Sequence, residues 1–119
     1  MKTFSFEKLK VWQKSKELSK IIYQTTTSFP EEEKFGIISQ MRRCSVSISS
    51  NIAEGTGRHG KKDKARFTEI AYGSSLELLN QVIISYELGF IQENHHKDIR
   101  INIEEITKML DGLYKSQLN

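Results

Sequence analysis

The residues best suited to chemistry form a dense group of cations between positions 58 and 66. The group consists of Arg58, Lys61, Lys62, Lys64 and Arg66. One carboxylate, Asp63, lies among them, so the segment has a net charge of +4. Lysine and arginine neutralise nucleic-acid phosphates, and such contacts carry little base specificity. The segment predicts contact with RNA or DNA backbones, and the alternative is that its charges only solvate the start of a helix.

The glycines around this segment do not form the phosphate-binding loop of nucleotide hydrolases. That loop needs the pattern GxxxxGK[ST] after a β-strand, and here no serine or threonine follows Lys61 and Lys62. A basic turn ahead of a helix still suits backbone phosphates, because helix N-termini attract anions.

A second basic segment lies between positions 2 and 20. It holds six lysines and two glutamates, a net charge of +4, and Lys10 and Lys14 are its candidates for phosphate contact. The whole chain has a net charge of only +3, so the remaining residues sum to −5. This asymmetry predicts a basic face on a mildly acidic body.

No constellation of residues indicates catalysis or a metal site. The serines of the stretch 45–51 have no histidine near them in the sequence or in the helical pattern, as an activated nucleophile requires. Glu93 and His96 form one Glu-x-x-His motif, whereas a di-iron bundle needs two such motifs and two further glutamates. Cys44 is isolated in an apolar stretch and is expected to be a small core residue. We expect a protein that is not an enzyme and uses no metal or cofactor.

The spacing of the apolar residues predicts the elements that position these groups. Four helical segments run from about Phe6 to Thr27, Pro30 to Gly55, Lys62 to Leu88 and Asn94 to Leu113. In three of them, apolar and small residues recur at alternating spacings of three and four, as on one face of a helix. Four helices with short connections specify an all-α, antiparallel up-and-down four-helix bundle. At this length, residues 1–119 form a single domain.

Residues at the expected helix ends support these boundaries. Ser5 and Asn94 are the expected N-caps of the first and last helices. Pro30 suits a first turn, where its missing N–H has no helical partner. Gly89 followed by Phe90 predicts a left-handed C-cap with a hydrophobic contact just beyond it.

The second and third helices have more packing surface than one four-helix core needs to bury. The third has two apolar faces, and the second has a seam of small and aliphatic residues, so we expect a homo-oligomer. The residues expected to pack between copies are Ser45, Ile48, Ser49 and Ile52. Structural ion pairs, within or between copies, are expected among Arg42, Arg43, Glu54, Glu69 and Glu77.

The sequence resembles a known family along nearly its whole length. The resemblance rests on FEKLKVWQKSKEL, FPEEEKFGIISQMRRCSVSISSNIAEGTGR, FTEIAYGSSLELLNQ and ELGFI, in this order. The core signature SxSSNIAEGxGR is similar to that of the 23S rRNA intervening-sequence proteins, also called S23 ribosomal proteins, with Cys44 where alanine is common. The resemblance implies an up-down bundle that assembles into a homopentameric ring. It also implies kinship with the accessory bundle protein of diversity-generating retroelements, which works with nucleic acid.

Two functions stay open at this point. The first is a non-catalytic, oligomeric bundle protein that binds RNA or DNA through a basic face. The second is a protein–protein scaffold or adaptor whose charge only keeps it soluble. A cytoplasmic location is expected for both. The one cysteine cannot form an internal disulfide, and no window approaches the ~20 apolar residues of a membrane span.

Overall fold

The computed structural model describes residues 1–119 and shows an all-α helical bundle without strands, which confirms the predicted class. Its helices are α1 (Lys10–Thr26), α2 (Ile37–Thr56), α3 (Lys61–Glu87) and α4 (Glu93–Leu118). Two 3₁₀ turns, η1 (Ser5–Lys8) and η2 (Glu31–Glu33), precede α1 and α2. The bundle measures 43 × 29 × 21 Å along its principal axes. None of its helices combines the length and apolar character needed to cross a membrane.

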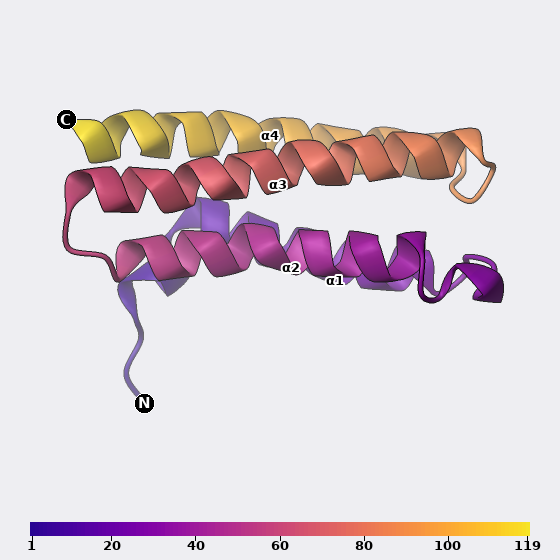
Figure 1. Cartoon of the computed structure of the whole chain (residues 1–119), viewed down its shortest axis with the longest axis horizontal. Coiled ribbons are helices and arrows are strands. Elements are labelled where there is room, and N and C mark those ends of the chain that lie inside the picture. The colour runs from indigo at the N-terminus through magenta and orange to yellow at the C-terminus, as the bar shows by residue number, and fades with distance from the viewer.

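The connections between helices alternate between the two ends of the bundle (Figure 1). The α2–α3 turn lies at the same end as both chain termini, and the α1–α2 and α3–α4 connections lie at the other end. The cationic group 58–66 and the start of the basic segment 2–20 therefore share one end. We call it the basic end.

The core is one cluster of buried side chains to which all four helices contribute. On α1 and α2 every position of the predicted apolar lines is buried, and on α4 only Leu113 is partly accessible. Buried hydroxyls on α1 and α3 bond to their own helices: Ser15 donates to the Val11 carbonyl (2.7 Å) and Ser75 to the Ala71 carbonyl (3.0 Å). Small side chains satisfied in this way let neighbouring helices approach closely.

Two helices begin later than the sequence predicts. Ahead of α1, η1 is closed by the Phe4 N–H, which donates to the Glu7 carboxylate at 2.8 Å, and extended backbone at Leu9 separates this turn from the helix. Ser5 lies inside the turn and does not cap α1. Ahead of α2, Gly36 adopts φ −105° and ψ −117°, outside the helical region. The acidic run after Pro30 therefore forms η2 and not the first turn of α2.

The predicted C-cap of α3 is present. Gly89 has φ +81°, a conformation that glycine adopts without a Cβ clash. The Phe90 N–H donates to the Ser85 carbonyl (2.9 Å) and the Gly89 N–H to the Tyr86 carbonyl (3.0 Å), the pattern of a Schellman motif. The Phe90 ring then packs against Phe29, with 5.3 Å between ring centroids. This contact joins the two connections at the end opposite the basic end.

Candidate nucleic-acid interface

The α2–α3 turn depends on a close approach between the two helices. A Cβ added at Gly55 would lie 2.9 Å from the Cβ of Phe67, closer than real side chains come. Only glycine therefore fits at this position, and α2 continues one residue further to Thr56 before the chain turns. This packing fixes where α3 begins and where its first cations point.

Gly55→Ala is expected to destabilise the protein by about 1–3 kcal/mol, because the added methyl overfills a site bounded by Cβ and backbone atoms. Gly112→Ala is the matched control: it lies inside α4 with nothing within 4 Å of an added Cβ. Alanine is favoured over glycine in a helix interior by roughly 0.5–1 kcal/mol, so the control should gain stability. Chemical denaturation measures both changes, and equal gains would contradict the close approach.

Two of the predicted phosphate-contacting residues are engaged within the turn itself. The Arg58 guanidinium lies 4.5 Å from the centroid of the Phe67 ring and 3.6 Å from a carboxylate oxygen of Glu54. Lys64 Nζ donates to the Thr56 carbonyl at 3.0 Å, near the C-terminus of α2, where a cation is favourable. These two cations shape the turn and are only partly free for a ligand.

The other three cations of the group are exposed and form no ion pair. Lys61, Lys62 and Arg66 lie on the first two turns of α3. The N-cap Gly60 offers no side-chain hydrogen bond, so the first backbone N–H groups of α3 also lack a side-chain partner. The arrangement presents free positive charge together with a helix N-terminus, which suits a phosphate group.

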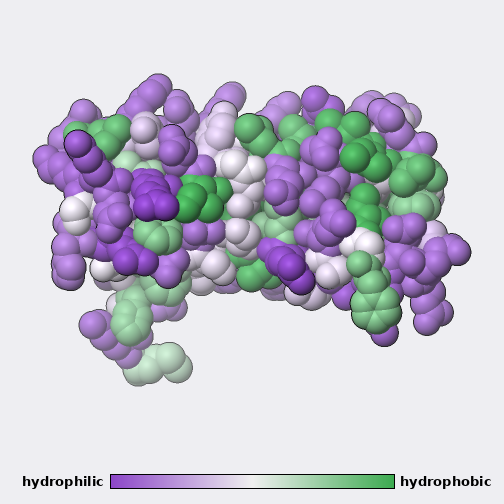
Figure 2. Space-filling view, viewed as in Figure 1, coloured by the Kyte–Doolittle hydropathy of each residue, from purple (hydrophilic) through white to green (hydrophobic).

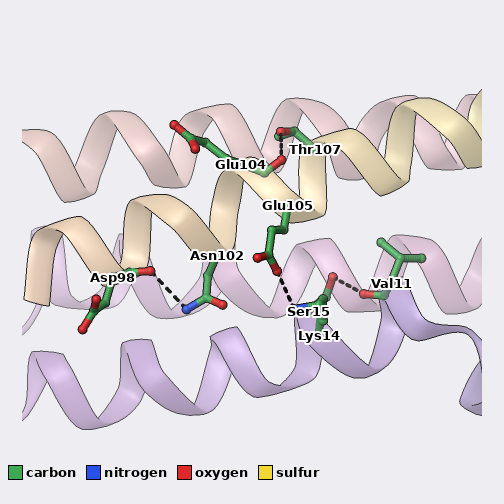
Figure 3. Close-up of polar contacts among 8 residues, drawn as sticks. All are labelled: Val11, Lys14, Ser15, Asp98, Asn102, Glu104, Glu105 and Thr107. Carbon is green, nitrogen blue, oxygen red and sulfur yellow. Dashed lines mark hydrogen bonds and ion pairs between the residues drawn. The ribbon is translucent and has the colours of Figure 1, made fainter.

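The two lysines of α1 that are candidates for phosphate contact differ in whether they are already paired. Lys10 is exposed and unpaired at the start of the helix. Lys14 forms an ion pair with Glu105 of α4, with 2.5 Å between Nζ and a carboxylate oxygen (Figure 3). Both side chains are about half exposed, so the pair is worth only ~0–1 kcal/mol and can exchange for a phosphate.

The residues predicted to form ion pairs are distributed over separate sites. Arg42 donates to the Thr26 hydroxyl (2.9 Å) and the Tyr23 carbonyl (3.3 Å), and thereby binds α2 to the end of α1. Glu54 pairs with Arg58, and Glu69 is exposed on α3 without a partner. Arg43 forms no ion pair within the chain, so a pair to another copy stays a prediction.

Arg43 instead lines a groove of about 500 Å³ between α2 and α3. The groove also contains Cys44, Ser47, Ser74 and Glu77. Burial, together with the nearby Glu77 carboxylate, raises the pKa of the Cys44 thiol to about 12. The thiol therefore stays protonated at neutral pH and donates to the Ser74 carbonyl. The structure contains no group of three or more His, Cys, Asp or Glu side chains placed to hold a metal ion.

Three of the four residues predicted to pack between copies are buried within a single chain instead. Ser45, Ile48 and Ile52 are at most 2% exposed and pack inside one chain. The seam on α2 faces its own core, because α1 and α3 cover it, and only Ser49 stays partly accessible. Of the four helices, α3 carries the most exposed apolar side chains, namely Ile70, Tyr72, Leu76 and Ile84, and Leu88 directly follows it. Figure 2 shows hydrophobic residues breaking the hydrophilic surface near the α3–α4 connection.

Phe67, on which the Arg58 guanidinium stacks, was not predicted as part of the site. Its distance of nine residues from Arg58 matches no helical spacing, and the pair meets only because the chain turns between them. No signal in the sequence could have identified this contact.

Comparisons with known proteins agree with the fold. The family model described as 23S rRNA-intervening sequence protein matches residues 7–112. A solved structure from Bacteroides thetaiotaomicron, described as a protein with unknown function from the S23 ribosomal protein family, is similar with a TM-score of 0.79. The two sequences are 24% identical, over 88% of this chain and 98% of that one. No curated protein matches the sequence.

Proposed function

Because the chain belongs to the 23S rRNA-intervening sequence protein family, we propose that it is a non-catalytic, homo-oligomeric bundle protein that binds RNA or DNA through its basic end. The observation that supports this most is the exposed, unpaired state of Lys61, Lys62 and Arg66 at the N-terminus of α3. Lys10 adds a further free cation on α1. Contacts of this kind recognise phosphates and not bases.

The proposed assembly is a ring of antiparallel up-and-down bundles, and five copies follow from the family resemblance. Exposed apolar residues on α3 and the groove of Arg43 and Glu77 supply a surface for another copy. A ring repeats the basic end once per subunit. Several weak phosphate contacts on one particle then act together, so binding can be firm without sequence recognition.

The test replaces Lys61, Lys62 and Arg66 together by Gln and measures affinity for a mixed RNA and DNA pool across salt concentrations. Each lost phosphate contact should reduce the magnitude of the slope of log K against log salt by ~0.7–0.9. The slope of the triple variant should therefore be smaller in magnitude than that of the wild type by about 2–3. Fold and oligomer should persist, because these side chains make no contact that the bundle needs.

The matched control changes Lys34, Lys97 and Arg100 to Gln. These residues are exposed at the other end of the bundle. Their substitution removes the same charge as the triple variant at the basic end. An equal loss of slope in both triple variants would show that net charge, and not the basic end, determines binding. If the wild type binds no nucleic acid at low salt, the proposal fails and a protein-only scaffold takes its place.

A further inference from the structure

Aromatic rings accompany the cations at the basic end. The N-terminal segment projects from the bundle with hydrophobic and hydrophilic residues mixed along it (Figure 2). The Phe4 and Phe6 rings are nearly parallel, at 7° and 6.4 Å between centroids, and Phe6 meets Trp12 edge-on at 5.0 Å. Phe4 is 47% exposed. We call Phe4, Phe6 and Trp12 the aromatic arm.

Lysines lie directly over this arm. Lys2 Nζ is 4.8 Å from the centroid of the Phe4 ring, and Lys16 Nζ is 5.0 Å from that of Trp12. Both lysines are exposed and form no ion pair. A nucleotide presents a flat base and a phosphate, so its base can take the place of the ammonium group on the ring while its phosphate pairs with that ammonium group.

Hydrogen bonds hold the arm in place. The Phe4 N–H donates to the Glu7 carboxylate, and Gln13 Nε2 donates to the Glu7 carbonyl, both at 2.8 Å. The first bond closes η1, and the second connects this segment to α1. A preorganised arm binds a ligand without a large ordering cost.

We propose that the aromatic arm stacks on unpaired bases, so that the basic end prefers single-stranded RNA or DNA to duplexes. This inference rests on the proposed function and names its substrate class. The bases of a duplex are stacked on each other, and their faces are closed to a side chain, whereas those of a single strand are open. Cations alone do not account for such a preference.

The test compares three probes at low salt by fluorescence anisotropy: a labelled mixed-sequence single strand, the same strand annealed to its complement, and an abasic strand of equal length. The single strand should bind most tightly. Trp12 is the only tryptophan of the chain, so its emission reports on the arm and should be quenched by the single strand but not by the abasic strand.

Phe4→Ala should weaken single-strand binding by roughly five- to 150-fold, the range for one stacked base, and leave abasic binding unchanged. Phe4→Leu keeps an apolar side chain without a ring face and should lose most of this affinity, whereas Phe4→Tyr should retain it. The matched control is Phe35→Ala. Phe35 is 90% exposed with Lys34 over its ring but follows η2, at the other end of the bundle. Because Phe35 also lines the groove of Arg43, light scattering first checks that the variant keeps the wild-type mass, and binding of all three probes should then be unchanged.

Four outcomes overturn the inference. Equal affinity for the three probes, or unchanged binding by Phe4→Ala, refutes base stacking and leaves the proposed function in place. A change of oligomer mass in Phe4→Ala identifies the arm as a contact between copies. Wild-type protein that binds none of the probes refutes the proposed function as well.

Discussion

Leu78→Ala is expected to lower the free energy of unfolding by about 2–5 kcal/mol. Leu78 is fully buried at the middle of α3, and the core around it draws on all four helices. Truncation removes the transfer free energy of the side chain and leaves a cavity that two long, packed helices cannot collapse to fill. Urea or guanidinium unfolding followed by circular dichroism measures the loss.

The matched control is Leu118→Ala, the same change at a leucine that is 44% exposed at the end of α4. It should cost well under 1 kcal/mol, because the side chain is already in water. Similar losses in the two variants would mean that α3 does not present Leu78 to the core.

The second large effect concerns assembly. Leu76→Glu and Ile84→Glu each place a carboxylate on the exposed apolar surface of α3, where both side chains are more than 40% accessible. A charge buried between copies without a partner is costly, whereas the same charge on a free chain is solvated. Each variant should therefore keep its helix content but fall in mass to the 13.8 kDa monomer. Light scattering after size exclusion gives the mass.

Ile101→Glu serves as the comparison, since Ile101 is at least as accessible but lies on α4. It should leave the oligomer intact. If it dissociates the oligomer while the α3 variants do not, the contact between copies lies on α4. A monomeric wild type at tens of micromolar would remove the oligomer from the proposal.

Much of the bundle could be predicted because short stretches of the sequence determine which helix faces are buried and where a helix ends. The alternating spacings on α2 and α4 named the residues that are buried, and Gly89 marked the end of α3. The starts of α1 and α2 could not be predicted in the same way. They depend on a carboxylate that closes η1 and on the backbone angles of Gly36, whereas the expected helix-start residues Ser5 and Pro30 lie several residues ahead of both starts.

The candidate site was predictable in composition but not in geometry. Charge density identified the cations of the α2–α3 turn, but not that Lys64 bonds to the Thr56 carbonyl while Lys61 and Lys62 stay free. Such differences arise from three-dimensional contacts between separate helices. The same reason explains the α2 seam, since a periodic line of small residues does not say whether its partner helix belongs to the same chain or to another.

The sparse contact between α1 and α4 affects how the chain folds. Most interhelical packing joins neighbours in sequence, and α1 contacts α4 far less. The side-chain polar contacts between α1 and α4 are the Lys14–Glu105 ion pair and the Thr25–His95 hydrogen bond. Contacts of low sequence separation need little loop closure before they form. The bundle can therefore assemble hairpin by hairpin, and the meeting of its first and last helices adds little to the barrier.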